Sequence, residues 1–563
     1  MNSFLKKYSL IFFAGMIIVA CGGNNTTPSK ELIRELHLKS GKLISCGPPE
    51  KEFGIVDFEM TCDEKMKNDF NVAIELLHSF EYDESEKVFA KIIDESPDCA
   101  MAYWGVAMCN FHPLWEPPTE ADLKKGAEAV EIAKSITGKS ERESEYINAV
   151  AAYYKDWNKK IAPQQRALNF EKAMEQLYKK YPDDKEAAIF YALALDAEAK
   201  PTDKSYANQK KAGDILNALY TAEPNHPGII HYIIHTYDYP GIADLGLLAA
   251  KRYAQVAPSS AHALHMPSHI FTRLGLWDDC IKSNTESVDA AECYAESAGI
   301  KGHWDEELHG LDYLVYAYLQ KGDNKSAGEQ LKYIESINEV YPVNFKGAYT
   351  FAAAPSRVAL ENKNWNEAAT LQLHPANFPW NKFPWQEAII HFARLLGNVH
   401  TKNIEAAQSE LTKLNQLHDT LEKQKESYNA NQVAIQIKAS EAWIKFAGGE
   451  TTEALNLMKL AANMEDSTSK HPVTPGEVLP ARELYADMLL ETKQNENALQ
   501  EYEAVLQKSP NRFNSLYGAG VAAERLNNTE KAVLYYKQLL AIADSNSDRP
   551  ELVAAKKSLK NHE

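Results

Sequence analysis

Two short segments of the chain carry histidines at a spacing that suits metal binding. HPGIIHYIIH contains His231 and His235, and HALHMPSHIF contains His265 and His269, so the members of each pair are four residues apart. On a helix, residues four apart lie on one face, about 6 Å apart along the axis, and two imidazoles can point at one ion. The two pairs are themselves 34 residues apart. This predicts that they occupy the same position in neighbouring structural units.

The chemistry of these side chains favours a transition metal. Neutral imidazoles suit zinc or copper, whereas magnesium and calcium prefer oxygen ligands. We therefore expect a metal site formed by His231, His235, His265 and His269, with zinc or copper as the cofactor. Two other interpretations stay open. The histidines could hydrogen-bond a peptide or a small anion in a groove, or they could be packing residues of the core.

A proline interrupts the second histidine pair. Pro267 lies between His265 and His269. Proline has no backbone N–H and clashes with the carbonyl four residues earlier, so we expect the helix to kink or to begin late at this point. The break affects the direction in which His262 and His265 point.

Short amphipathic helices must position these residues. Helix-favouring segments follow one another from about Asp63 onward, and they recur with a period of 34. Ala498 and Ala532 are 34 residues apart in matching segments, and Pro224 and Pro258 end two consecutive units at the same interval. This repeated spacing resembles the tetratricopeptide repeat, a hairpin of two helices with a period of 34 residues.

The resemblance extends over most of residues 66–545 and implies the fold. It implies an all-α tetratricopeptide-repeat superhelix, an α-solenoid of one or two arrays, in which first helices line a concave groove. Proteins of this family act mostly as scaffolds for peptides or partner proteins, so a protein or peptide partner in the groove is expected. The histidine-bearing stretches look like a subgroup of bacterial proteins of this kind, and for them the resemblance supports a fold rather than an activity.

The family register also indicates which other residues face the groove. The register is counted from the proline that ends a unit or, for the unit beginning near Leu308, from Gly322 and Ala327. Eight further residues then fall at groove positions and are expected to bind a ligand: His262, His309, Asp312, Tyr316, Asp238, Arg273, Trp104 and His112. An aromatic cap on the turn FHPLWEPP is a competing interpretation of His112.

The first residues are predicted to form a targeting signal. Residues 1–20 combine Lys6 and Lys7 with an apolar stretch that is too short to span a bilayer, which is typical of a signal peptide. Ile18-Val19-Ala20-Cys21 resembles the lipobox of bacterial lipoproteins, which implies cleavage before Cys21 and acylation of its thiol. We expect the protein in the cell envelope, lipid-anchored to the outer membrane or on the periplasmic face.

Composition excludes one class of partner and permits disulfides. With 78 acidic and 60 basic residues the net charge is −18, so the chain would repel nucleic acid. Six cysteines follow Cys21, and an oxidising envelope would allow them to pair, although their pairing cannot be deduced from one sequence. No phosphate-binding loop, GxSxG elbow or HExxH motif occurs.

The sequence therefore predicts an organisation and a role. The expected organisation is a signal peptide (1–20), a tether and N-terminal segment (21–62), an N-terminal array with a histidine-lined groove (63–342), an irregular Pro/Trp-rich connection (343–384) and a C-terminal array (385–563). The expected role is an envelope-anchored binding or scaffold protein with a histidine cluster for a metal or another ligand. The alternatives are a metal-dependent enzyme, assisted by His309, Asp312 or Glu306, and a scaffold without metal.

Overall fold

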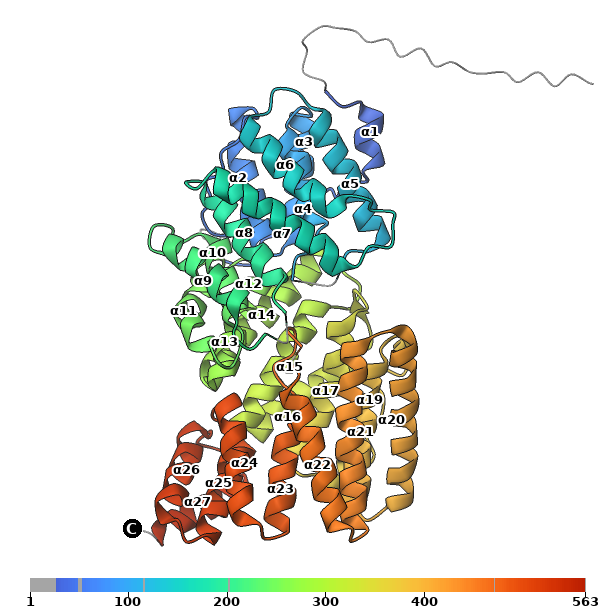
Figure 1. The fold of residues 1–563 in the computed structure, drawn as a ribbon, viewed down its shortest axis with the longest axis vertical. Helices are drawn as coiled ribbons and strands as arrows, with labels where there is room; N and C mark the ends of the chain where they lie inside the picture. Colours follow the sequence, from blue (N-terminus) through green and yellow to red (C-terminus); the bar gives the residue numbers. More distant parts are fainter. Residues whose placement is uncertain (1–26, 49–52, 115–116, 201–202, 470, 562–563) are drawn as a thin grey trace, which may run out of the picture.

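The protein is an all-α solenoid, as the repeat pattern predicts. We describe it from a computed structural model (Figure 1), which describes residues 27–48, 53–114, 117–200, 203–469 and 471–561. The predicted signal peptide and Cys21 lie outside the described residues. Among the helices that are described, none is long and apolar enough to cross a membrane.

The N-terminal half is a series of helix pairs that follow one another down the molecule. Its helices are α1 (Lys30–Glu35), η1 (Glu64–Met66), α2 (Lys67–His78), α3 (Tyr82–Glu95), α4 (Ala100–Cys109), α5 (Glu120–Ser135), α6 (Glu141–Tyr154), α7 (Pro163–Lys180), α8 (Lys185–Ala197), α9 (Ala207–Tyr220), α10 (Pro227–Tyr237), η2 (Ala243–Gly246), α11 (Leu247–Val256), α12 (Ala261–His265), α13 (Pro267–Leu274) and α14 (Trp277–Ala298).

The C-terminal half continues in the same manner. Its elements are β1 (His303–Trp304), α15 (Asp305–Gln320), α16 (Asn324–Ser336), β2 (Val340–Tyr341), α17 (Phe345–Glu361), α18 (Trp365–Ala368), η3 (Trp380–Lys382), α19 (Pro384–His400), α20 (Ile404–Gln424), α21 (Ser427–Ala447), α22 (Thr451–Asp466), α23 (Ala481–Glu491), α24 (Asn495–Lys508), α25 (Phe513–Arg525), α26 (Thr529–Ile542) and α27 (Pro550–Lys560). The strands β1 and β2 form a short parallel pair.

Small residues allow the helices of a pair to approach closely. Ala498 in α24 and Ala532 in α26 are fully buried, as the matching repeat positions predict. Gly518 in α25 faces the ring of Tyr502, and a Cβ atom at this position would lie 2.3 Å from that ring. A larger residue at position 518 would therefore push α24 and α25 apart.

The segment before α2 packs along the array as an extended chain. Phe53, Val56 and Phe58 are buried, and disulfides join Cys62 to Cys99 and Cys46 to Cys293. These pairings complete a framework that the sequence left open. The segment therefore forms part of the folded body.

The expected irregular connection is partly helical. Residues 345–361 form α17, a long buried helix, and only the stretch between α18 and η3 lacks regular structure. Alanines dominate the middle of α17 and favour the helix despite Pro355. Helices α14 and α15 contribute to both large apolar cores, so the two cores meet there.

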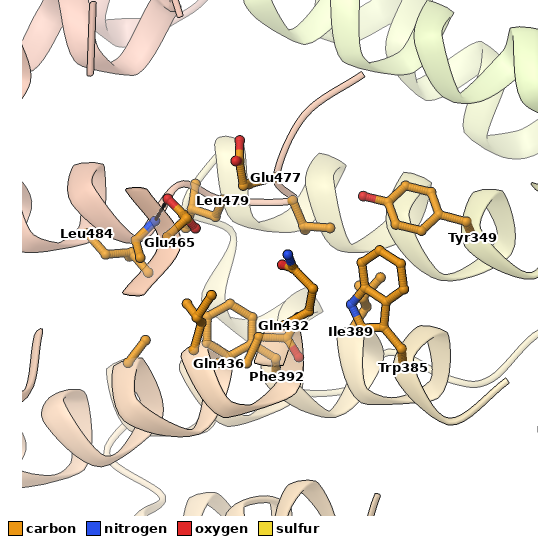
Figure 2. Close-up of a pocket in the computed structure, with 14 residues that line it drawn as sticks. Tyr349, Trp385, Ile389, Phe392, Gln432, Gln436, Glu465, Glu477, Leu479 and Leu484 are labelled. Carbon is orange, nitrogen blue, oxygen red and sulfur yellow. Dashed lines mark hydrogen bonds between the residues drawn. The ribbon is translucent and has the colours of Figure 1, made fainter. Parts of the chain in front are cut away.

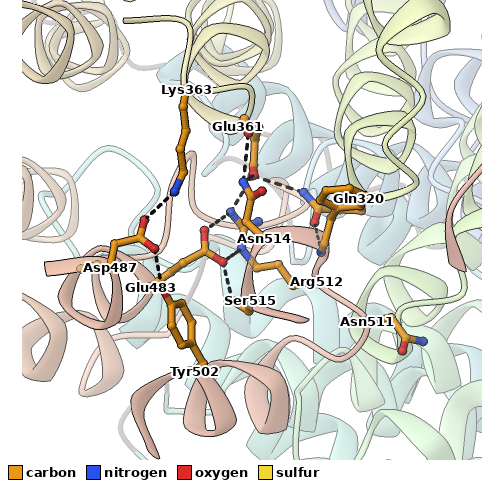
Figure 3. Close-up of polar contacts among 12 residues, drawn as sticks. Gln320, Glu361, Lys363, Glu483, Asp487, Tyr502, Asn511, Arg512, Asn514 and Ser515 are labelled. Atoms are coloured by element: carbon orange, nitrogen blue, oxygen red, sulfur yellow. Dashed lines mark hydrogen bonds and ion pairs between the residues drawn. The ribbon is translucent and has the colours of Figure 1, made fainter. Parts of the chain in front are cut away.

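The C-terminal repeats return to contact the middle of the chain. Trp277 donates from Nε1 to the carbonyl of Asn511 at 2.9 Å, and the Asn511 amide donates to the carbonyl of Gly275. Beside this contact, buried Arg512 bonds Glu361 at 2.6 Å and Glu483 at 2.7 Å (Figure 3). These contacts fasten α23 and α25 to α14 and α17.

Candidate metal centre

Helix α10 carries the first histidine pair. Pro227 occupies its first turn, where its missing N–H is not needed, and the His226 ring accepts from the amide of Ile229 as an N-cap. Gly228 follows, and a Cβ atom there would lie 2.5 Å from the His78 ring. The start of α10 is thus held tightly against α2.

The predicted helix break occurs at Pro267. Ser260 caps α12, which ends at His265, and Pro267 occupies the first turn of α13. Helix α13 ends at Gly275, which adopts a φ of +65° that favours glycine. The three histidines of these two short helices are all buried.

Two groups of three histidines form inside the array. In the first, Nε2 of His231 lies 3.1 Å from Nε2 of His235 and 3.2 Å from Nε2 of His262. Each of the three offers a nitrogen within 4.8 Å of the other two. We call this group the first trio.

The second trio consists of His265, His269 and His309. Nε2 of His265 lies 3.1 Å from Nε2 of His269, and the ring centroids of His265 and His309 are 4.2 Å apart. Their ligand nitrogens also lie within 4.8 Å of one another. The trios are neighbours, because the rings of His235 and His269 are 6.3 Å apart.

Hydrogen bonds at Nδ1 set the tautomers of three of these rings. His231 donates to the backbone carbonyl of His78 at 2.6 Å, and His269 lies 3.0 Å from the carboxylate of Asp238. His265 lies 2.6 Å from the amide oxygen of Asn284. Each partner is an acceptor, so Nδ1 carries the hydrogen in the neutral ring and Nε2 presents a lone pair.

The orientation of Asn284 is itself determined by its surroundings. Its Nδ2 group donates to the carbonyl of Cys280 at 2.8 Å, which turns the amide oxygen toward His265. In the second trio, two Nε2 lone pairs therefore face each other at 3.1 Å. Two acceptors at this distance repel each other unless a cation lies between them.

Burial keeps four of the six rings uncharged. It lowers the pKa of His231 to about 3, and burial together with the neighbouring imidazoles lowers the pKa of His235, His262 and His309 well below the usual value. Neutral imidazole is the form that binds a metal.

The predicted single site of four histidines is divided. His231 and His235 group with His262, and the second pair groups with His309. The physical reason is the spacing of neighbouring repeat helices, about 8–10 Å, which places a histidine of the next turn or the next repeat closer than the other pair. Both additional members were predicted as groove residues.

A third polar cluster surrounds Glu186, and the sequence analysis missed it. His78 and His226 each place Nε2 2.9 Å from a Glu186 oxygen, and His78 Nδ1 lies 2.9 Å from the hydroxyl of Tyr232. Ile229 donates to the remaining His226 nitrogen. These bonds join α2, α8 and the start of α10, and the three side chains also offer ligand atoms within 4.8 Å of one another.

Asp238 and Arg273 support the second trio. Arg273 donates from Nε to Asp238 at 2.8 Å, and the other carboxylate oxygen of Asp238 faces His269. Such carboxylate–histidine pairs orient metal ligands and raise their basicity. Both residues were predicted to face the groove; they line the cleft beside His235, and Asp238 also bonds His269.

Asp312 and Tyr316 of the predicted groove, and Glu306 of the alternative enzyme, lie elsewhere. Asp312 forms an ion pair with buried Arg357, and the guanidinium of Arg357 lies 5.2 Å from the Tyr316 ring centre. Glu306 bonds Lys346 at 2.5 Å. These side chains are engaged in buried pairs whose cations lie on α17, so they are not directed at the trios.

Trp104 and His112, both predicted to face the groove, have different surroundings in the structure. Trp104 is covered by Phe58 of the N-terminal segment, with ring centroids 5.7 Å apart, so the chain itself fills this part of the groove. The ring of His112 lies 4.8 Å from that of Tyr82, tilted by 43°, and it lines a cleft beside His235. The turn after α4 therefore contributes to a cleft wall.

A second hollow, between α17, α19 and α21, is far smaller than the cleft beside His235. Tyr349, Trp385, Glu465 and Glu477 line it, and its volume is about 40 Å³ (Figure 2). Such a space suits water rather than an organic ligand.

Known proteins resemble the chain in its repeats. Residues 481–547 match the family model described as tetratricopeptide repeat. No curated protein sequence matches the chain. Similar solved structures include yeast Tom70, which is 10% identical with a TM-score of 0.33, covering 89% of this chain and 96% of that one. The APC/C hetero-tetramer Cut9–Hcn1 is 12% identical with a TM-score of 0.26, covering 88% and 96%. These scores are too low to support the fold, so its assignment depends on the helix pairs described above.

Proposed function

We propose that this tetratricopeptide-repeat protein binds two transition-metal ions, zinc or copper, one in each histidine trio. One observation carries the proposal: the Nε2 atoms of His265 and His269 approach to 3.1 Å while both Nδ1 atoms face acceptors. A bound cation removes the repulsion between the two lone pairs.

The geometry of both trios supports this assignment. Nitrogens bound to one tetrahedral ion at about 2.05 Å are separated by about 3.3 Å. The separations of 3.1 and 3.2 Å among the Nε2 atoms are close to this value. Three histidines per ion also leave a coordination position open, as in catalytic rather than structural zinc sites.

The setting of the proposal is the cell envelope. Disulfides persist in oxidising compartments, and the pairs Cys46–Cys293 and Cys62–Cys99 support a location outside the cytoplasm. Acylation at Cys21 would then anchor the array to a membrane. In this setting the outer surfaces of the repeats are available to a protein partner, while the metals lie inside.

Metal analysis of the protein, purified without a histidine tag, tests the proposal. We expect about two equivalents of zinc or copper per chain after reconstitution, one for each trio. Replacing His231 and His265 together with alanine should abolish stoichiometric binding, whereas His418→Ala, which alters a histidine outside the trios, should not.

The contrary result is equally definite. Without a metal, a proton must lie between His265 and His269, and the histidines are then structural parts of a scaffold. Absence of stoichiometric metal, together with an unchanged melting temperature on adding Zn(II) or Cu(II), would overturn the proposal. Circular dichroism of each variant separates loss of metal from loss of fold.

A further inference from the structure

A cleft opens beside the first trio. Its volume is about 530 Å³, and His235, Asp238 and Arg273 lie along it. Of the six trio histidines, His235 is the one that is not fully buried. The cleft is therefore the place where a molecule from solvent can approach the first trio.

Aromatic rings and prolines make up part of the cleft wall. Phe111, Tyr206 and Tyr239 line it together with several prolines, among them Pro113 and Pro240. Flat apolar walls favour a flat apolar ligand, because stacked rings bury area at low cost in conformational entropy. The volume is that of a typical small-molecule site and too small for a folded partner.

The charges of the cleft limit how anionic its ligand can be. Lys508 lies 3.2 Å from Glu477, and Arg273 donates to Asp238. The third cation of the cleft, Lys204, donates to the hydroxyl of Ser469, and Asp196, Glu198 and Asp466 add negative charge to the lining. A polyanion would therefore find little uncompensated positive charge. A ligand with one or two oxygens that can bind a metal suits the site better.

We infer that this cleft binds a small aromatic molecule whose ring hydroxyl or carboxylate oxygens coordinate the metal of the first trio. The inference rests on the proposed function, since the trio must hold a metal. Three histidines leave a coordination position for the ligand oxygen, and the ring packs against the aromatic residues of the lining, among them Phe111 and Tyr239. The cleft would also give a substrate access to the metal, which a metal-dependent enzyme requires.

The test uses 4-nitrocatechol, whose visible absorption changes when its oxygens bind a metal. Full-length protein with measured metal content is titrated with this probe, and the metal-free protein serves as the blank. Ala167 lies on the cleft wall in α7, and Ala167→Trp should fill the cleft without touching a histidine. We expect the spectral change in the wild type and at least a tenfold weaker affinity in this variant.

A matched control comes from the neighbouring helix. Ala152 in α6 lines a different surface groove, so Ala152→Trp makes the same change of size elsewhere and should bind the probe like the wild type. If Ala167→Trp fails to fold, Ala197→Trp, at the end of α8 and also in the cleft lining, takes its place.

The outcomes distinguish failure of the proposed metal centre from failure of the proposed cleft site. Metal present with no spectral change, or with equal affinity in the cleft variant, overturns the cleft site and leaves the metal centre intact. Absence of metal in the wild type overturns both. Metal retained by all variants, with probe binding lost only when the cleft is filled, supports the inference.

Discussion

His231 donates from Nδ1 to the backbone carbonyl of His78, 2.6 Å away and 153 residues earlier in the chain. A main-chain carbonyl cannot change its role, so α2 determines the tautomer of a histidine on α10. The His78 ring is in turn held by Glu186 and Tyr232. The position of the first trio thus depends on the packing of the first repeat.

Asp238→Asn should weaken metal binding at the second trio. Asparagine offers one acceptor where the carboxylate serves both His269 and Arg273, so the His269 ring is held less firmly. Loss of such a partner typically costs 10–100-fold in metal affinity. Competition with a chelator should show one of the two metals released about 10–100-fold more easily.

The control for this variant is Asp214→Asn, an exposed aspartate on α9. It changes the net charge equally and should leave both metal affinities unchanged. Equal weakening of both trios by Asp238→Asn would contradict the role assigned to this carboxylate.

Arg512→Met should strongly destabilise the C-terminal half. The variant leaves Glu361 and Glu483 buried without the cation that lies between them (Figure 3). Removing one partner of a buried ion pair costs about 3–5 kcal/mol. Urea unfolding should show this loss, whereas Arg525→Met, whose guanidinium bonds a backbone carbonyl near the surface, should lose less than about 1 kcal/mol. Similar losses in the two variants would refute the importance of the network.

Replacement of Cys46 and Cys293 by serine should cost more stability than replacement of Cys62 and Cys99. The two disulfides close segments of 247 and 37 residues. On the chain-entropy account they contribute about 5 and 4 kcal/mol, respectively. Unfolding midpoints of the two double variants measure the order. The reverse order would show that the entropy of the unfolded chain does not govern these crosslinks.

Glu465→Gln should increase stability at alkaline pH. Burial and the charge of Glu477 raise the pKa of Glu465 from 4.5 to about 8 in the folded protein (Figure 2). The folded state therefore favours the protonated group. This stabilisation is fully present below pH 4.5 and is lost as the pH rises through about 8.

Glutamine keeps an oxygen for the Ala481 amide, which bonds Glu465 at 2.9 Å, and it cannot ionise. We expect equal melting temperatures for the variant and the wild type near pH 4.5, and a more stable variant above pH 8. Glu422→Gln, at an exposed position of α20, is the control. Parallel pH profiles for Glu465→Gln and the wild type would count against a protonated Glu465.

The repeat period carried most of what the sequence could predict. The all-α fold, the break at Pro267 and the burial of Ala498 and Ala532 all follow from local patterns. Recurrence of the histidine pairs at 34 residues also identified the helices of both trios. These features depend on contacts within a repeat or between adjacent repeats. Such contacts require the same residue types at the same interval, so they appear as a period in the sequence.

Contacts between distant segments could not be predicted in this way. Trp104 has the register of a groove residue, yet Phe58 from an extended segment covers it. Asp312 has the same register, and its partner Arg357 lies two helices further along the array. The Glu186 cluster joins residues more than 100 positions apart. None of these pairings has a period, so a single chain does not reveal them.

The bond between Asn511 and the carbonyl of Gly275 has a mechanical consequence. A solenoid with free ends behaves as a spring, and each coil can flex without disturbing the others. Here the far coils brace the end of α13, the helix that carries His269. The part of the chain between α13 and α25 is therefore closed on itself rather than free at its far end, and a load applied to the last repeats would reach the helix that carries His269.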